Sequence, residues 1–195
     1  MPIHLVAAKD FVTNDWAGGS TTQLLIHPKG SSLAARDFEF RLSCARVEQS
    51  GQFSDFSGYD RLLLVLEGAM KLSSSALTEA RIQHADSSAW AFDGGLNVHA
   101  ELMATVVEDF NLFVPKGRLK SASRQQLAGQ QRWHQAAETG ASVYGVFLRH
   151  GQLSIGDTRL DSEHPLIISS TPLNLLAEVP SDLVAFAIGC RFPQP

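Results

Sequence analysis

The stretch FEFRLSCARV, Phe38 to Val47, has the period-two alternation of a β-strand. One face of this strand would carry apolar side chains, namely Phe38, Phe40, Leu42 and Cys44. The other face would carry Glu39, Arg41 and Ser43 before the strand ends in Ala45 and Val47. Solvent is the ordinary environment for the polar face of an alternating strand, but a polar pocket would suit the same side chains. The stretch therefore predicts a strand and leaves open what its polar face meets.

Runs of the same kind follow one another along the chain, with Gly, Pro, Asn, Asp and Ser between them. Besides the opening stretch, we predict strands at Ile3–Ala7, Gln23–His27, Arg61–Glu67, Met70–Ser73, Ala89–Phe92, Asn97–Val107, Asn111–Val114, Ser142–Arg149, Gln152–Ile155, Pro165–Ser169, Leu173–Glu178 and Leu183–Cys190. Many short strands at close spacing are typical of β-sandwiches and β-barrels. The sequence therefore predicts an all-β fold with little helix.

Each half of the chain contains one Gly-bearing turn between apolar runs, LEGAMKL around Gly68 and LRHGQLSI around Gly151. Each turn predicts a tight hairpin, and their matched positions suggest two related barrels in tandem. Between the halves, residues 116–140 are polar and nearly free of β-branched residues, so we interpret them as a linker with a ragged strand. We expect a first barrel over residues 1–118 and a smaller second barrel over residues 119–195.

Composition excludes several classes of protein. The 195 residues are 44% hydrophobic, which is enough to bury a substantial core. The formal net charge is -4 and the Lys and Arg residues are scattered, so the basic surface of a nucleic-acid-binding protein is missing. The longest apolar run, Leu62 to Leu66, is far shorter than the roughly 20 residues that span a bilayer. We therefore expect a soluble protein that binds neither nucleic acid nor membrane.

Two further features favour the cytoplasm. The first residues, MPIHLVAAKDF, lack the basic and apolar segments of a signal peptide. The two cysteines, Cys44 and Cys190, lie in apolar runs, where we interpret them as small buried hydrophobic residues and not as a disulfide. The expected location is therefore cytoplasmic.

Metal-binding and nucleophilic motifs give little support for catalysis. The best local pair of metal ligands is His99 with Glu101, which strand spacing places on one face. A catalytic zinc site has three protein ligands, and no close Cys or His completes this pair. No G-x-S-x-G turn occurs, and an apolar run does not activate a cysteine thiolate. We therefore predict neither a metal nor another cofactor.

The segment WAGGSTT, Trp16 to Thr22, has two interpretations. It could be a loop whose glycines relieve backbone crowding before the next strand. It could instead approach a ligand closely, with Trp16 as an aromatic wall and Thr21 or Thr22 as hydroxyl donors. The residues alone do not decide between the two.

The segment GQFSDFSGYDR, Gly51 to Arg61, is rich in both aromatic and turn-forming residues. Phe53 and Phe56 could close one end of a barrel. Asp55 and Asp60 would then accept hydrogen bonds from turn amides, which is the usual role of Asp in such loops.

The segment VVEDFNLFV, Val106 to Val114, places two polar residues among apolar ones. Asp109 and Asn111 lie two residues apart, so they share a strand face. Buried carboxylate and amide groups need partners, because desolvating them unpaired costs several kcal/mol, on the order of 2–7. The two residues therefore either anchor a neighbouring loop or help to form a polar pocket.

Three segments together resemble the HutD/Ves family of bacterial proteins. They are WAGGSTTQLLI, FRLSCARVEQSGQFSDFSGYDRLLLVLEG and EDFNLFV. The family pattern has a Trp before a Gly-rich turn and a Thr, then R-x-S-x-A-x-V with G-x-F-S-x-F-x-G-x-x-R-x-L-x-x-L-E-G, then D-F-N. The central motif is long and specific. The resemblance covers mainly Trp16 to Val114 and is weak from Leu119 onward.

The resemblance implies a cupin-type fold with two β-barrels in one chain, a bicupin. It also implies a connection to histidine utilisation, in which family members are thought to bind a pathway intermediate and moderate flux; other members are stress-associated. The residues that match the family motifs, and that we expect to bind a ligand, are Trp16, Thr22, Arg41, Ser43, Phe53, Ser54, Phe56, Arg61, Asp109 and Asn111. Metal-dependent cupins carry an H-x-H motif with a following Glu, which has no match here. Many members also have an Asn after the Trp, and this chain lacks it, which bears on the identity of the ligand.

Three functions fit these residues. In the first, Arg41 offers a forked cationic donor to a small anionic metabolite such as N-formylglutamate, formiminoglutamate or urocanate. Ser43, Thr22 and Asn111 would add hydrogen bonds and Trp16 an apolar wall. In the second, the chain is an enzyme, a hydrolase, lyase or isomerase of a related metabolite, in which Asp109 is the base and Arg41 stabilises charge.

In the third function, Arg41 and Asp109 form a buried structural pair and the protein is an interaction module with no small ligand. The binding protein is the favoured hypothesis, and whether it is an enzyme is left open. Exposed barrel edges would also allow a homodimer.

Overall fold

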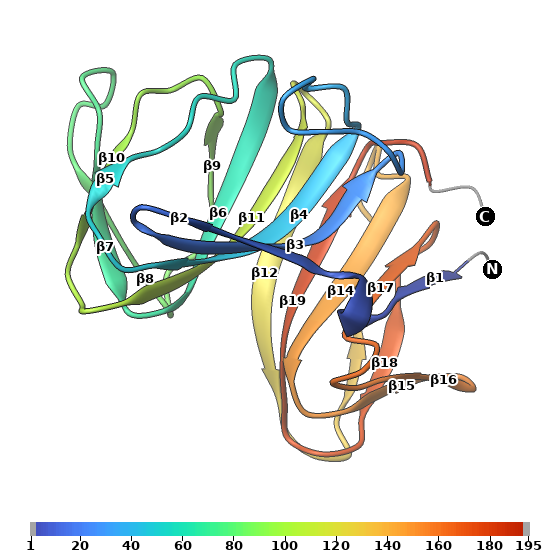
Figure 1. Cartoon of the computed structure of the whole chain (residues 1–195). Coiled ribbons are helices and arrows are strands. Elements are labelled where there is room, and N and C mark those ends of the chain that lie inside the picture. The colour runs from blue at the N-terminus through green and yellow to red at the C-terminus, as the bar shows by residue number, and fades with distance from the viewer. Residues whose placement is uncertain (1–2, 193–195) are drawn as a thin grey trace. The chain divides into compact units, whose positions relative to one another are not determined.

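The computed structural model describes residues 3–192 and contains almost only β-strands in that range (Figure 1). Its helical structure there is a single 3-10 turn, η1 (Ala8–Asp10), so no helix in the described range has the length and hydropathy needed to cross a membrane. The predicted all-β fold is confirmed. The chain divides into two compact units, Val12–Gly117 and a second one formed by residues 3–11 with 118–192.

The unit Val12–Gly117 consists of two sheets. A six-stranded sheet has the order β2-β3-β4-β11-β6-β9, and a four-stranded sheet has the order β5-β10-β7-β8. Their bounds are β2 Val12–Trp16, β3 Gly19–His27, β4 Phe40–Val47, β5 Gly51–Gln52, β6 Tyr59–Glu67, β7 Ala69–Ser73, β8 Arg81–His84, β9 Trp90–Asp93, β10 His99–Leu102 and β11 Val107–Pro115.

The second unit also consists of two sheets. A five-stranded sheet has the order β1-β17-β14-β19-β12, and a four-stranded sheet has the order β13-β18-β15-β16. Their bounds are β1 Ile3–Val6, β12 Leu119–Leu127, β13 Arg132–His134, β14 Val143–His150, β15 Leu153–Ile155, β16 Thr158–Leu160, β17 Leu166–Ser169, β18 Asn174–Ala177 and β19 Ser181–Ile188.

The two units repeat one strand order. Adding eight to each strand number converts β4-β11-β6-β9 into β12-β19-β14-β17, and β5-β10-β7-β8 into β13-β18-β15-β16. The expected hairpin glycines, Gly68 and Gly151, occupy matching turns at positive φ. Near each turn the ladder shifts register at the same place, which is the Asp109–Val65 pair in one unit and the equivalent Leu183–Leu148 pair in the other. The repeat therefore extends to single residue positions, although the residues themselves differ.

One expectation is not confirmed and another needs correction. The sheets of both units are open, so closed barrels are not confirmed. Residues 116–140 are not mainly a linker, because Leu119–Leu127 forms a nine-residue strand. Its sequence is polar, but it pairs along its length with the apolar strand β19, and this tertiary pairing outweighs its weak β-propensity.

The N-terminal strand extends the second unit. β1 pairs antiparallel with β17, so residues 3–11 join residues 118–192 in space although they precede Val12 in sequence. The two barrels expected from the sequence cover residues 1–118 and 119–195. Of these, residues 1–2 and 193–195 lie outside the described residues.

Candidate functional site

The opening strand, β4, is buried on both faces at its beginning. Phe40 and Leu42 have no exposed surface, and on the other face Arg41 is 6% exposed and Ser43 is 1% exposed. The polar face of this strand therefore does not look at bulk water.

Register across the six-stranded sheet gathers the polar residues on that face. Arg41 lies beside Phe113 of β11, and Phe113 lies beside Arg61 of β6. In the next row, Ser43 lies between Gln23 of β3 and Asn111. Paired residues of an antiparallel sheet point to the same side, so these side chains share one face.

Arg41 is held by two neighbours. Its Nε donates to Gln23 Oε1 and its Nη1 donates to Ser43 Oγ, both at 3.0 Å. Its guanidinium lies 5.8 Å from the centre of the Phe113 ring. Burial lowers the pKa of Arg41 to about 10, so the group is charged at neutral pH.

Arg61 takes part in a chain of hydrogen bonds that leads to Asp109. Its Nε and Nη2 donate to Asn111 Oδ1 at 2.9 and 2.6 Å. Asn111 Nδ2 in turn donates to Asp109 Oδ1 at 2.5 Å. Asn111 therefore stands between the cation and the carboxyl group. The Arg41–Asp109 pair considered from the sequence is not formed, since the hydrogen bonds of Arg41 go to Gln23 and Ser43.

Aromatic rings surround the guanidinium of Arg61. The distances from its Cζ to the ring centres are 4.0 Å for Phe53, 5.2 Å for Phe113 and 5.6 Å for Phe92. Cations are attracted to the faces of such rings, which partly replaces lost hydration. The rings therefore help to keep a buried cation in place while leaving its hydrogen-bond donors available.

Each guanidinium keeps one nitrogen without a protein partner in residues 3–192. These nitrogens are Nη2 of Arg41 and Nη1 of Arg61, because the other nitrogens of both groups make the bonds described above. Among the described residues, Gln135 Oε1 in the second unit is the side-chain nitrogen or oxygen atom that is both fully buried and without a partner. The two free guanidinium nitrogens are not fully buried, so they keep access to solvent and can receive an acceptor.

Arg41, Arg61, Asp109 and the side chains that contact them form what we call the Arg41–Arg61 cluster. The electrostatics of this cluster favour an anion. Burial raises the pKa of Asp109 to about 6, although Arg61 and the hydrogen bond from Asn111 act to lower it. Burial also lowers the pKa of Arg61 to about 10, so Arg61 stays charged at neutral pH. Two cations then face at most one negative charge, and the cluster is net positive.

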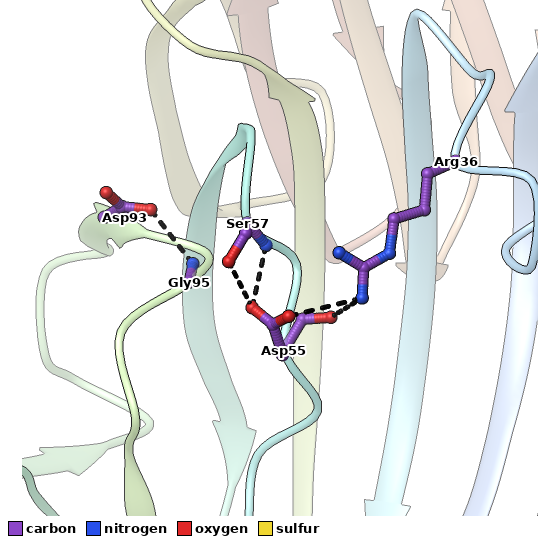
Figure 2. Close-up of polar contacts among 5 residues, drawn as sticks. All are labelled: Arg36, Asp55, Ser57, Asp93 and Gly95. Carbon is purple, nitrogen blue, oxygen red and sulfur yellow. Dashed lines mark hydrogen bonds and ion pairs between the residues drawn. The ribbon is translucent and has the colours of Figure 1, made fainter.

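Polar contacts hold the loop after β5, which carries Phe53 and Phe56, and Figure 2 shows those made by Asp55. Asp55 Oδ1 accepts from the Ser57 backbone N–H at 2.9 Å and from Ser57 Oγ at 2.6 Å, and these bonds lower the pKa of Asp55. Arg36 Nη2 donates to the Asp55 carbonyl at 2.7 Å. Across from this loop, Asp93 Oδ1 accepts from the Gly95 N–H at 2.9 Å. The predicted role of Asp55 in a turn is confirmed.

The same loop places its two phenylalanines. Phe53 lies over Arg61, whereas Phe56 packs on Phe113 with ring centres 4.3 Å apart. The backbone N–H of Phe56 donates to the carbonyl of Gly94 at 2.8 Å. Asp60, in strand β6, accepts from the N–H of Gly117 at 2.7 Å, and Gly117 lies in the turn after β11, so the predicted hydrogen bond from a turn amide is present.

Three of the predicted site residues lie away from the arginines. Trp16 pairs with Gly19 at the turn between β2 and β3, is 48% exposed and donates through Nε1 to Thr21 Oγ1 at 3.1 Å. Thr22 pairs with Cys44 and so points to the opposite face of the sheet. Ser54 is exposed in the loop after β5.

Two members of the cluster were not among the predicted site residues. Gln23 holds Arg41, and Phe92 of β9 lies against Arg61. Gln23 follows Thr21, which the sequence suggested as a hydroxyl donor to a ligand, by two residues. Period-two alternation could therefore have placed Gln23 on the same strand face as Thr21. The contact of Phe92 depends on the pairing of β9 with β6, which the sequence does not show.

The second unit shows that the fold does not need this polar cluster. Counting from Gly68 and Gly151, the positions of Arg41, Ser43, Arg61, Asp109 and Asn111 are taken there by Ser121, Ser123, Tyr144, Leu183 and Ala185. Leu183 and Ala185 belong to the apolar core of that unit. The charged residues of Val12–Gly117 are therefore an addition to the architecture.

The second unit also contains two arginines and a carboxylate, but in another arrangement. Asp182 receives Arg124 Nη2 at 2.8 Å and Arg149 Nη1 at 2.7 Å as direct ion pairs. In the Arg41–Arg61 cluster, neither guanidinium donates to the carboxyl group. The latter arrangement leaves charge and donors unused within the protein.

Histidine and acidic side chains do not assemble a metal centre in residues 3–192, where no three His, Cys, Asp or Glu gather in a suitable group. His99 and Glu101 lie on β10 and are exposed, and Glu101 pairs with Lys71 at 3.3 Å.

Comparison with known proteins follows the same segments. The family model described as HutD matches residues 8–185. A relative from Pseudomonas putida, described as an uncharacterized 21.2 kDa protein in the hutC 3′ region, is 33% identical over 139 residues, which is 70% of each chain. HutD from Pseudomonas fluorescens SBW25 is 27% identical and superposes with a TM-score of 0.71 over 98% of this chain and 100% of that one.

A conserved protein of unknown function from Pseudomonas aeruginosa PAO1 is also 27% identical, with a TM-score of 0.77 over 96% of this chain and 99% of that one. More distant structures share the fold alone. Bacterial pirin from Escherichia coli is 9% identical with a TM-score of 0.72, covering 95% of this chain and 98% of its own. Oxalate decarboxylase from Lactobacillus farciminis is 6% identical with a TM-score of 0.64, covering 98% and 87%. The fold is therefore cupin-like.

Proposed function

Because this chain belongs to the HutD family, we propose that its unit Val12–Gly117 binds a small carboxylate metabolite in connection with histidine utilisation. In this proposal the ligand is held by Arg41 and Arg61 and no metal takes part.

One observation carries the proposal: a buried, net positive cluster whose two guanidiniums each keep a free donor. Removing a cation from water costs several kcal/mol, on the order of 3–5 where it lacks a partner. A carboxylate would offset that cost, because it accepts charge-assisted hydrogen bonds from both arginines. Phe53 and Phe113 would give the ligand apolar walls.

Candidate ligands come from the family connection. The relative in the hutC 3′ region and the resemblance to histidine-utilisation proteins favour N-formylglutamate, formiminoglutamate and urocanate, all of which are carboxylates. The structure of the Pseudomonas fluorescens protein is described under a formate condition, and formate is the smallest carboxylate.

The test is isothermal titration of the protein with these three compounds and formate. We expect Arg41→Ala and Arg61→Ala to weaken binding roughly 10- to 100-fold, since a hydrogen bond to a charged group contributes about 1.5–3 kcal/mol. Arg46→Ala is the matched control, because Arg46 lies on the same strand but is half-exposed and pairs with Glu48. Unchanged binding of every compound by Arg41→Ala would show that the assignment is wrong.

A catalytic role is the second candidate, and the raised pKa of Asp109 favours it. A carboxyl group with a pKa of about 6 is suited to act as a general base near neutral pH. Proton NMR of each candidate ligand with stoichiometric protein distinguishes the two functions. Turnover that Asp109→Asn abolishes would support an enzyme, and ligands that remain intact would support a binding protein.

We further propose that the two units are the two halves of a bicupin. The shared strand order of β4–β11 and β12–β19 and the cupin-like fold support this.

A further inference from the structure

We propose that Asp109 makes binding at the Arg41–Arg61 cluster proton-coupled, so that an anionic ligand binds together with a proton. This inference rests on the proposed function and adds the regulation of the same site by pH.

The first argument is the order of groups along β11. Asp109, Asn111 and Phe113 lie on the same face of this strand. The carboxyl group of Asp109 is therefore two positions from the Asn111 amide and four from the Phe113 ring, which contacts both arginines. Arg61 donates to Asn111 and not to Asp109. A ligand can therefore reach the free nitrogen of Arg61 without breaking a bond to the carboxyl group.

The second argument is the surroundings of Asp109, which is 1% exposed. From β6, Arg61 acts on it electrostatically; from β4, the Ala45 backbone N–H donates to it, and from β11 the Asn111 amide does. Arg41 of β4 acts on Arg61.

Apolar side chains pack on this side of the sheet. Met70, Leu72, Val98 and Ala100 belong to the same buried core cluster as Val65, the cross-strand neighbour of Asp109. Glu108 points to the other face of β11, where it approaches Arg46 at 3.7 Å. Arg61 is therefore the main charge that favours ionised Asp109.

Ligand binding changes that balance. An anion at Arg61 places a negative charge in the low-dielectric interior and offsets the cation that favours ionised Asp109. The pKa of Asp109, already about 6, then rises further in the complex. By linkage, the complex binds more protons than the free protein, so affinity increases as pH falls. The increase spans the range from the pKa of the complex down to about 6 and levels off below it.

The experiment is titration calorimetry with N-formylglutamate and, as a minimal probe, formate, at pH 5.5 to 8.5 in buffers of different ionisation enthalpy. We expect proton uptake on binding near pH 7. We also expect an affinity gain of about tenfold for each unit by which the ligand raises the pKa of Asp109. Asp109→Asn should bind with an affinity that does not change over this range, and Asp15→Asn, an exposed control on β2, should behave as the parent protein.

Two outcomes would overturn the inference and leave the proposed function intact. One is pH-independent binding by the parent protein, and the other is an unchanged pH profile in Asp109→Asn. If Asp109→Asn does not fold, the buffer dependence of the parent protein still decides, since binding without proton uptake contradicts the proposal. Absence of binding by either probe at every pH would instead contradict the proposed function itself.

Discussion

Asp109 makes the stability of the folded chain depend on pH. Its ordinary pKa is 3.8, and burial raises it to about 6 in the folded protein. A raised pKa means that the folded state holds the proton more tightly than the unfolded state. The stabilisation is therefore complete below about pH 4 and is lost as pH rises through about 6. The shift corresponds to roughly 3 kcal/mol.

We expect Asp109→Asn to remove this loss of stability between pH 4 and 6, because the amide has no charge to desolvate. Urea unfolding at pH 4, 5, 6 and 7 measures the free energy of unfolding at each point, with Asp15→Asn as the exposed control. A slope between pH 4 and 6 that is the same in Asp109→Asn and the parent protein would contradict the assignment of the buried titration to Asp109.

At this scale the sequence identified most of the residues that the structure brings together. They stand in the family motifs and are Arg41, Ser43, Phe53, Phe56, Arg61, Asp109 and Asn111. What it did not show is how they combine: Arg61 and Asn111 are 50 residues apart in sequence and meet through strand pairing. Arg41 and Asp109 have opposite charges, so the sequence allowed them to form a pair. In the structure Arg41 donates to Gln23, and Asp109 accepts from Asn111.

At the scale of strands, the turn between β2 and β3 depends on close backbone approach. Gly19 has φ of +148°, and a Cβ at this position would lie 2.0 Å from the carbonyl oxygen of Arg46 on β4. Gly19 therefore allows β3 to approach the backbone of β4 closely. This agrees with the interpretation in which the glycines of the segment relieve backbone crowding.

We therefore expect Gly19→Ala to destabilise the fold by about 1–3 kcal/mol or more, since neither the backbone conformation nor the neighbouring strand admits a methyl group. Gly51→Ala is the control, because Gly51 has open space around its Cα and no positive φ. Denaturant unfolding of both variants measures the difference, and equal stability would contradict the close approach of β3 to β4.

Strand β12 shows where local pattern fails. Leu119–Leu127 contains Lys, Ser, Arg and Gln, and its sequence resembles a linker. It forms a strand because β19, a strand with six consecutive buried residues from Leu183 to Ile188, offers backbone partners to Leu119 and, after a register shift, to every residue from Ser121 to Leu127. Local propensity is a weak indicator wherever such a partner is present.

At the scale of the whole molecule, β1 connects the beginning of the chain to its second half. All four residues of β1 pair with β17, and Val6 is buried. Strand pairing between segments this far apart in sequence is invisible to a local pattern.

We expect a chain truncated to begin at Ala8 to lose protection in β17, because that strand becomes the edge of its sheet. Hydrogen exchange followed by mass spectrometry should show faster exchange in peptides covering Leu166–Ser169 and little change in peptides covering β16. Leu5→Ser, at a side chain that is 38% exposed, keeps the pairing and is the control. Unchanged exchange in β17 after truncation would contradict the pairing.

By itself, the sequence determined the strand texture, the two hairpin glycines and the motif residues, because alternation, turn chemistry and motif spacing are local properties. Only the tertiary structure decided that Arg41 and Ser43 are buried, that Gln23 and Phe92 contact the two arginines, and that one unit carries Asp109 and Asn111 where the other carries Leu183 and Ala185. The physical reason is that a polar side chain alternates in the same way whether it meets water or a buried partner. Its environment is set by distant strands whose pairing no local pattern contains.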